Sequence, residues 1–317
     1  MIISVSRRTD IPAFYSDWFF NRLKEGYVYV RNPFNRKQVS KINLNPEVVD
    51  CFVFWTKDPL PMMKRLDELK DYCYYFQFTL TPYRRDIETN IRKKRDIIKT
   101  FKQLSNIIGK EKVIWRYDPI FINEFYNKEY HYEWFERFAY ELSNYTEKCV
   151  ISFIDLYKKT LRNTKHLNIE ELKDEDIFQI AEKFSSVAQK YNIKIETCSE
   201  SIDLTQYGIK KGKCINDKLI SRILGCQLDV KKDNTQREVC GCVKSIDIGE
   251  YNTCKHNCLY CYANFNYKQV DEKYKKHLRN SPLLVGELYG DEKITVREMK
   301  SIKCDNNGHM EQLKLDI

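Results

Sequence analysis

The chain contains 317 residues, 42% of them hydrophobic and 31% charged, which is the balance of a soluble globular protein. Its first residues are too few and too polar for a signal peptide, and it has no run of about 18 apolar residues, which excludes a membrane span. We therefore expect a cytoplasmic protein. The net charge of +9 permits an anionic partner such as nucleic acid but does not require one.

Short β-branched or aromatic runs predict strands, and apolar residues at helical spacing between them predict helices. The first expected strand spans residues 2–6 and precedes a helix over 18–25, which Gly26 ends. Further strands are expected at 28–30, 51–56, 74–80, 113–117, 149–155 and 193–198, and further helices at 61–69, 87–108, 134–142 and 174–190. This alternation predicts an α/β fold with a parallel (β/α) barrel, complete or partial and TIM-like.

The character of the sequence changes near residue 200, where alternating strands and helices give way to loops rich in cysteine, lysine and aspartate. Two helices are expected in this part, at 217–224 and 267–278. We therefore divide the chain into a barrel-like domain, residues 1–200, and a cysteine-rich, cluster-binding extension, residues 201–317, that packs on the barrel mouth.

Polar side chains recur where the expected strands end, and the carboxyl ends of the strands form the active site in barrels of this kind. Arg116 lies within an apolar strand, where a buried charge is costly unless it is paired or functional, and we favour a site-lining role for it. The loop after the first expected strand, residues 7–12, contains two arginines and one aspartate. These residues could bind an anion, or an Arg–Asp ion pair could fix the conformation of the loop, and we treat the two interpretations as equal alternatives. The candidate site residues are Arg7, Arg8, Asp10, Lys57, Arg116, Asp118, Asp155 and Glu196.

Twelve cysteines need an explanation in a cytoplasmic protein, where disulfides are rare. Nine of them follow residue 197, and this clustering favours metal ligation over scattered core packing. The other three, Cys51, Cys73 and Cys149, lie in or beside apolar runs, so we expect them to be small buried hydrophobic side chains.

Three of the nine form a C-x3-C-x2-C motif of Cys254, Cys258 and Cys261, with Tyr260 just before the third. Thiolates that close together can bind three irons of one [4Fe-4S] cluster and leave the fourth iron without a protein ligand. A zinc site is the main alternative, because closely spaced cysteine pairs are also common there. We expect His256, inside the motif, to face solvent.

Four other cysteines could form a second four-thiolate site, which would fold this region around a metal. They are Cys198, Cys214, Cys240 and Cys242, and their alternative role is that of buried or adventitious cysteines. Cys226 and Cys304 are spare candidates.

The C-x3-C-x2-C loop, with its aromatic residue at Tyr260, resembles the signature of the radical S-adenosylmethionine (SAM) superfamily. Almost the whole chain also resembles the domain of unknown function family 1848, whose members are described as radical-SAM-like. The segments that carry this second resemblance are Val5-Ser6-Arg7-Arg8-Thr9-Asp10-Ile11-Pro12, Phe54-Trp55-Thr56-Lys57-Asp58-Pro59, residues 233–237, Cys240-Gly241-Cys242, residues 245–251 and Cys254 through Ala263.

The resemblance to the radical SAM superfamily implies an enzyme in which a reduced cluster cleaves SAM that is bound at the open iron. The resulting 5′-deoxyadenosyl radical would take a hydrogen atom from an anionic substrate of unknown identity. A flavodoxin or ferredoxin would supply the electron. Arginine and lysine side chains would bind carboxylate or phosphate groups, and the acidic residues would pair with them or hold SAM. A second [4Fe-4S] cluster on Cys198, Cys214, Cys240 and Cys242 would relay electrons or bind substrate.

The chain departs from radical SAM enzymes in two respects. In those enzymes the cysteine loop follows the first barrel strand, whereas here it follows nearly all strands, and a Gly-Gly-Glu segment that would hold the SAM amino group is missing. We expect the loop to fold back over the open end of the barrel. The alternatives are a zinc-stabilised nucleic-acid-binding protein, which the charge and the 14% aromatic content would suit, and an iron–sulfur enzyme that does not use SAM.

Overall fold

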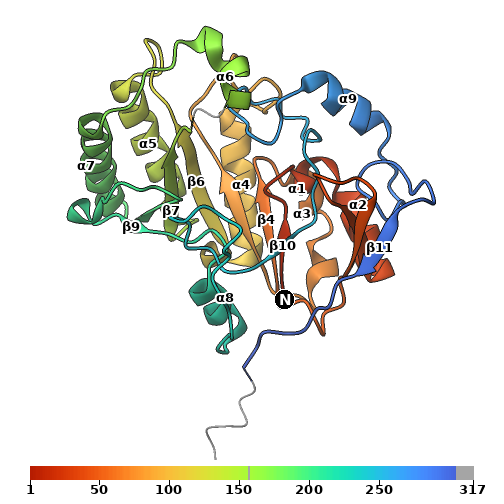
Figure 1. Ribbon diagram of the computed structural model, residues 1–317. Coiled ribbons are helices and arrows are strands. Elements are labelled where there is room, and N and C mark those ends of the chain that lie inside the picture. Colours follow the sequence, from red (N-terminus) through yellow and green to blue (C-terminus); the bar gives the residue numbers. More distant parts are fainter. Residues whose placement is uncertain (156–157, 305–317) are drawn as a thin grey trace, which may run out of the picture.

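The computed structural model describes residues 1–155 and 158–304 (Figure 1). Eight strands form its main sheet: β1 Ile2–Val5, β4 Cys51–Thr56, β5 Tyr74–Thr79, β6 Val113–Ile120, β7 Lys148–Phe153, β8 Lys194–Thr197, β9 Lys210–Lys211 and β10 Ile246–Asp247. They follow the order β10-β1-β4-β5-β6-β7-β8-β9, and each neighbouring pair is parallel. The predicted α/β fold with a parallel sheet is therefore confirmed.

A smaller sheet of three strands lies at the right-hand side of Figure 1. It contains β2 Tyr27–Arg31, β3 Gln38–Asn43 and β11 Lys293–Val296. β2 and β3 are antiparallel, and β11 joins β3 in parallel. The strand expected at 28–30 therefore exists, but it belongs to this second sheet.

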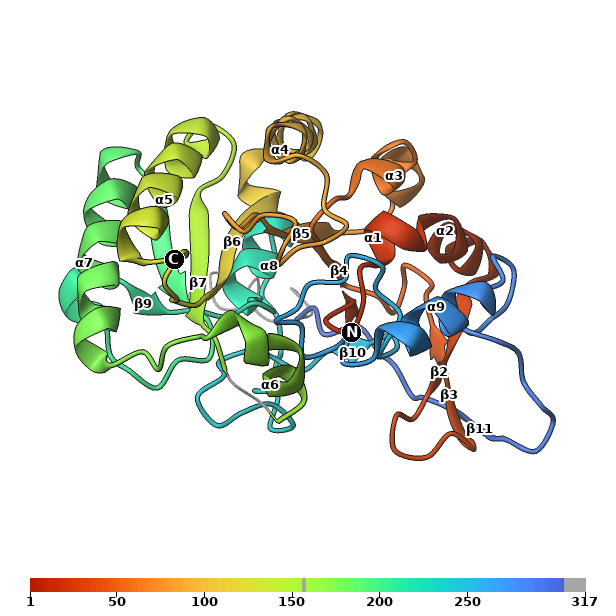
Figure 2. The same cartoon turned by 90° about the horizontal axis from the view of Figure 1, so that it is seen from above.

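Helices connect the strands of the main sheet. They are α1 Ile11–Phe14, α2 Ser16–Glu25, α3 Leu60–Met63, α4 Lys94–Ile108, α5 Lys128–Leu142, α6 Lys158–Thr164, α7 Asp174–Lys190, α8 Asp217–Leu224 and α9 Tyr267–Lys275, with 3₁₀ turns at Leu66–Leu69, Lys110–Lys112, Lys165–Leu167 and Thr205–Tyr207. Figure 2 shows α7, α5, α4 and α3 along the outside of a curved row of strands. None of the helices in the described part of the chain has the length and apolar character needed to cross a membrane.

The helix expected at 87–108 begins only at Lys94. The apolar spacing of Ile87 and Ile91 continues the pattern of this helix in sequence, but both residues lie in turns that precede it. Ile87 instead accepts a backbone hydrogen bond from Leu259, in the cysteine motif. A tertiary contact has therefore overridden the local helical pattern.

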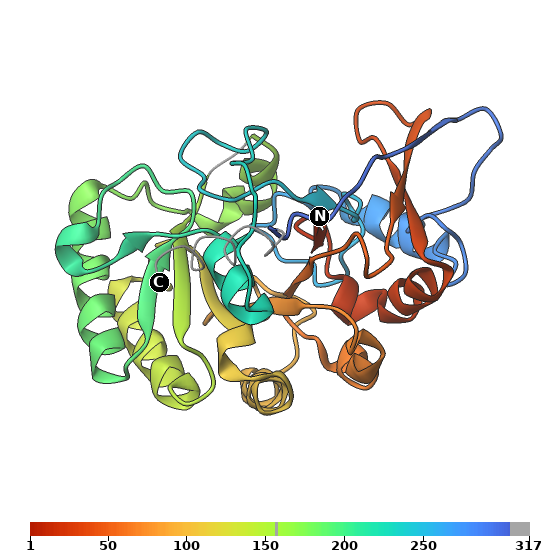
Figure 3. The same ribbon diagram turned by 90° about the horizontal axis from the view of Figure 1, so that it is seen from below.

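Successive side chains along a strand point to opposite faces of the sheet, and the two faces of the main sheet pack against different elements. On the outer face, side chains such as Phe54 and Phe76, which stack at 4.8 Å, belong to the large core that includes the buried faces of the helices. On the inner face, Val53, Tyr75 and Ile114 pack with residues of α8 and the loops beside it. Figure 3 shows α8 from below, on the opposite side of the sheet from α4 and α5.

The inner face becomes more polar toward the carboxyl ends of the strands. Residues two positions apart in a strand point to the same face. The inner-face residues that follow Val53, Tyr75, Ile114 and Val150 are therefore Trp55, Gln77, Arg116 and Ser152. A strand that is apolar almost throughout, such as β6, can thus place one charged side chain, Arg116, on the same face as the buried apolar side chain of Ile114.

Strand β10 comes from the part of the chain that follows residue 200, and it pairs in parallel with β1 at the sheet edge. The Asp247 carboxylate accepts hydrogen bonds from the hydroxyls of Ser4 (2.9 Å) and Ser6 (2.6 Å) and from the backbone N–H of Arg7 (2.8 Å). The chain on both sides of residue 200 therefore contributes to the main sheet, and the division into two domains stays a prediction.

We predict that Asp247→Ala lowers the free energy of unfolding by about 3 kcal/mol, because several donors to a charged carboxylate lose their acceptor together. Urea unfolding of the full-length chain measures this change. Asp229→Ala, at an exposed position, is the matched control and is expected to change stability by less than about 0.5 kcal/mol. Equal effects of the two substitutions would contradict the role given to Asp247.

Candidate functional site

A cavity of about 430 Å³ lies at the carboxyl ends of the main-sheet strands. Seven of the eight candidate polar residues line it: Arg7, Arg8, Asp10, Lys57, Arg116, Asp118 and Asp155. Both predicted cysteine sets line it as well, with Cys254, Cys258, Tyr260 and Cys261 from the motif and Cys198, Cys214, Cys240 and Cys242 from the second set. The structure thus brings together residues from the beginning, the middle and the end of the sequence.

Glu196 is the exception among the candidate polar residues. Its carboxylate pairs with the Lys148 ammonium at 2.8 Å, and it lies outside the residues that line the cavity. Glu196 stands one position before Thr197, the last residue of β8, so it is part of the strand rather than of the loop that follows. Cys198, after the strand, faces the cavity instead.

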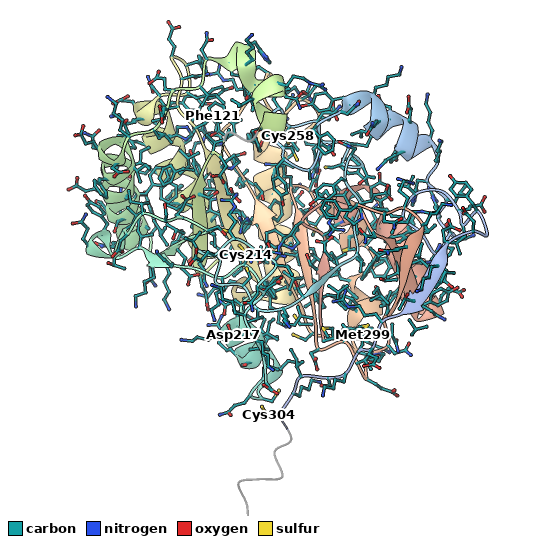
Figure 4. The ribbon with its side chains drawn as sticks, viewed as in Figure 1. Phe121, Cys214, Asp217, Cys258, Met299 and Cys304 are labelled. Carbon is teal, nitrogen blue, oxygen red and sulfur yellow. The ribbon has the colours of Figure 1, made fainter. Side chains whose placement is uncertain are left out.

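The loop that follows β5 holds the cysteine motif in place. The Leu259 N–H donates to the Ile87 carbonyl (3.0 Å), and the Asn90 N–H donates to the His256 carbonyl (3.1 Å). Between these bonds, Glu88 and Cys258 form an antiparallel bridge. Figure 4 shows Cys258 near the upper end of the molecule, and Cys214, from the second set, lower and toward α8.

Backbone N–H groups lie close enough to two of the three motif sulfurs to affect their titration. The N–H of His256 acts to lower the pKa of Cys254, and those of Ala263 and Asn264 act to lower the pKa of Cys261. Burial raises the pKa of all three thiols, and the Lys57 ammonium opposes this rise at Cys258. The loop therefore presents buried sulfurs together with donors that stabilise negative charge on them.

Glu88, which we did not identify from the sequence, is the centre of an ionic network beside the motif. Its buried carboxylate accepts from the ammonium groups of Lys57 (2.7 Å) and Lys94 (2.5 Å) and from the hydroxyls of Thr81 (2.6 Å) and Tyr260 (2.5 Å). Burial alone would raise the pKa of Glu88, but the two ammonium groups outweigh it and hold that pKa well below its usual range. The network thus anchors the motif through Tyr260.

His256 does not face solvent, contrary to the expectation from the sequence. It is 4% exposed, and its Nε2 atom lies 2.7 Å from the Asp10 carboxylate. Asp10 also accepts from the backbone N–H of Lys57 (2.7 Å) and of Ala13 (2.9 Å) and from the Thr56 hydroxyl (3.0 Å). Asp10 therefore positions the cysteine loop through His256, whereas Arg8 of the first loop pairs with Asp247 (3.9 Å) rather than with Asp10.

Arg116 forms hydrogen bonds both to a member of the second cysteine set, Cys214, and to the carboxylate of Asp118. Its guanidinium donates to the Asp118 carboxylate through Nε (3.1 Å) and Nη2, and to the Cys214 sulfur through Nη1 (2.8 Å). The sulfurs of Cys198 and Cys214 are 3.1 Å apart. Hydrogen bonds with Cys214 lower the pKa of Cys198 and of Cys242.

Three buried polar atoms on the cavity wall have no hydrogen-bond partner in the described structure. They are Arg7 Nη2, Thr9 Oγ1 and His256 Nδ1. Buried polar atoms are rarely left unpaired in folded proteins, so water or a polar ligand in the cavity would supply the missing partners.

Within residues 1–155 and 158–304, no three histidine, cysteine, aspartate or glutamate side chains converge on a point that could hold a single metal ion. A zinc site places four ligands around one ion, whereas each ligand of a [4Fe-4S] cluster binds a different iron. The side chains as they stand therefore do not form a mononuclear site.

The chain matches the family described as Domain of unknown function (DUF1848) over residues 2–263. It therefore belongs to this family, and the resemblance noted from the sequence is confirmed. The match ends at Ala263, two residues after the last cysteine of the motif. Neither the curated proteins nor the solved structures gave a match to the chain.

We predict that Glu88→Gln destabilises the protein by about 3 kcal/mol, because Lys57 and Lys94 would keep buried charges without a counter-charge. Urea unfolding measures the loss, and hydrogen exchange at the Leu259 amide reports how far the cysteine loop loosens. Glu68→Gln is the matched control: Glu68 also contacts two cations, Arg65 and Lys24, but at the surface, where about 1 kcal/mol or less is expected. Unchanged exchange at Leu259 would contradict the anchoring role.

Glu200 predicts a dependence of stability on pH. Burial raises its pKa to about 7, although the Phe153 N–H donates to its carboxylate at 2.9 Å. Between pH 5 and pH 7 the folded chain thus holds a proton that the unfolded chain has lost, so the free energy of unfolding falls as pH rises through this range. We expect Glu200→Gln to gain about 2 kcal/mol over the wild type between pH 5 and pH 8, whereas the exposed Glu171→Gln should show no such gain.

Proposed function

We propose that the protein is an iron–sulfur enzyme of the radical SAM type, which holds a [4Fe-4S] cluster on Cys254, Cys258 and Cys261 and cleaves SAM reductively. The observation that carries this proposal is that the three thiols line one cavity together with the polar strand ends. Three protein ligands for four irons leave one iron open to a small molecule in that cavity.

The place of the cysteine loop in the sheet supports the proposal. The loop follows β10, and β10 occupies the edge position before β1, so in spatial order it follows the first strand of the sheet although it comes late in the sequence. This spatial placement is compatible with the radical SAM arrangement, although the Gly-Gly-Glu segment is still missing. We also propose that the curved main sheet acts as a partial (β/α) barrel whose mouth is covered by the cysteine-rich extension.

The donor set around the motif fits a cluster. Hydrogen bonds from backbone N–H groups to cysteine sulfur are among the features that set the potential of iron–sulfur clusters, and backbone N–H groups near Cys254 and Cys261 favour negative charge on their sulfurs. When bound, the cluster would supply the electron that cleaves SAM, delivered by a flavodoxin- or ferredoxin-type donor in the cytoplasm. The protein positions the reactants and excludes water from them.

The residues around the motif have separate tasks in this proposal. Asp10 and Glu88 are occupied by protein donors and therefore hold the loop, rather than SAM. Thr9 Oγ1 and His256 Nδ1, which lack partners, are placed to contact polar groups of SAM. Five cationic side chains and three carboxylates line the cavity, which favours an anionic substrate.

The test is the low-temperature electron paramagnetic resonance spectrum of the anaerobically purified, reduced protein, recorded with and without SAM. We expect a [4Fe-4S] signal that changes shape when SAM is added, and release of 5′-deoxyadenosine. Cys258→Ala should abolish the SAM-dependent change. Cys226→Ala, outside the cavity, should retain it.

Other results would select the other functions. A [4Fe-4S] signal that is indifferent to SAM would indicate an iron–sulfur enzyme that does not use SAM. A colourless protein with stoichiometric zinc would contradict the proposal and favour the zinc-stabilised nucleic-acid-binding protein.

A further inference from the structure

The second cysteine set lies on the wall of the cavity. Cys198 follows β8, Cys214 precedes α8, and Cys240 and Cys242 come from the loop before β10. The sulfurs of Cys198 and Cys214 lie 3.1 Å apart, and Cys240 and Cys242 line the same cavity. Four thiols from three separate segments therefore border one cavity.

Cationic and N–H donors face these sulfurs. Arg116 Nη1 donates to the Cys214 sulfur at 2.8 Å, and the Ile215 N–H donates to the Cys242 sulfur at 3.4 Å. The guanidinium carbons of Arg7 and Arg116 lie 5.4 and 5.0 Å from the centre of the Trp55 ring, so a cation–π contact helps to hold both in place. Neutral thiols are weak acceptors, so these donors would interact more strongly with sulfurs that carry negative charge.

The described residues satisfy the two guanidinium groups beside these sulfurs to different extents. Asp118 compensates Arg116, whose side chain is 5% exposed. Arg7 has Asp247 near it, but its buried Nη2 atom has no partner. A [4Fe-4S] cluster with four thiolate ligands carries a net charge of about −2, which would complement two guanidinium groups.

We propose that Cys198, Cys214, Cys240 and Cys242 hold a second [4Fe-4S] cluster that transfers electrons and binds no substrate. Four protein ligands occupy every iron, so no iron is left open for another molecule. The sulfurs of Cys198 and Cys214 would separate by side-chain rotation as each takes its own iron. The site itself does not depend on the proposed function; only its role as a neighbour of the SAM cluster rests on it.

Arg116 would influence the reduction potential of this second cluster. A cation and an N–H···S bond at a ligand sulfur favour the reduced cluster, which carries one more negative charge. One electron from a low-potential donor, such as a ferredoxin-type protein or dithionite, reduces the cluster, and no bond in the protein forms or breaks. The guanidinium therefore makes this cluster easier to reduce.

Iron and acid-labile sulfide contents of the anaerobically purified full chain test the proposal. We expect about eight irons per chain in the wild type and about four in Cys240→Ala/Cys242→Ala, which should keep the SAM-sensitive signal. Cys226→Ala is the control and should keep about eight. About four irons in both the wild type and the double variant, or one zinc that the double variant loses, would overturn the proposal.

A redox titration offers a second test that does not depend on removing ligands. In Arg116→Gln we expect one of two cluster signals to move to a more negative midpoint potential while the other stays, and Arg116→Lys, which keeps the charge, should move it less. Two signals that respond equally would overturn the assignment. About eight irons without any effect of SAM would keep the second cluster and contradict the radical SAM function instead, so the two failures are distinguishable.

Discussion

The Asp247 carboxylate joins the parts of the molecule on which the cavity depends. It accepts hydrogen bonds from Ser4, Ser6 and the Arg7 backbone on one side and from the Gly249 N–H on the other. A side chain at Gly249 would overlap the Ser6 hydroxyl, so the close approach of the two segments requires glycine there. Because β10 is only two residues long, side-chain contacts supply much of what holds it beside β1.

Most of the fold could be predicted because the strands and helices are strongly patterned. The helices at 174–190 and 217–224 were predicted with their observed bounds, and each main-sheet strand of the first 200 residues was located to within a few positions, whereas β3 of the smaller sheet was not predicted. β10 could not be predicted, since two residues carry no periodic signal and its pairing is entirely long-range. Barrel closure also depends on curvature, which no local pattern encodes.

The candidate site also contains residues that local sequence patterns predict and residues that depend on contacts between distant parts of the chain. Arg116 and the residues after each strand were predicted because alternation and a parallel sheet together bring strand ends to one edge. Glu88 and His256 were missed or misplaced because their importance comes from partners far away in sequence: Tyr260 lies 172 positions from Glu88, and Asp10 lies 246 positions from His256. A single glutamate or histidine in a polar segment has no local feature that distinguishes it from a surface residue.

The pairing of β1 with β10 also sets the order of events during biosynthesis. Ser4 and Asp247, which meet across this pair, are separated by 243 positions. When the ribosome has released β1 and its neighbours up to β8, the edge strand and all three motif thiols are still to be made. The nascent sheet must therefore remain open at that edge, and the cavity is complete only after the residues of the cysteine motif have been made.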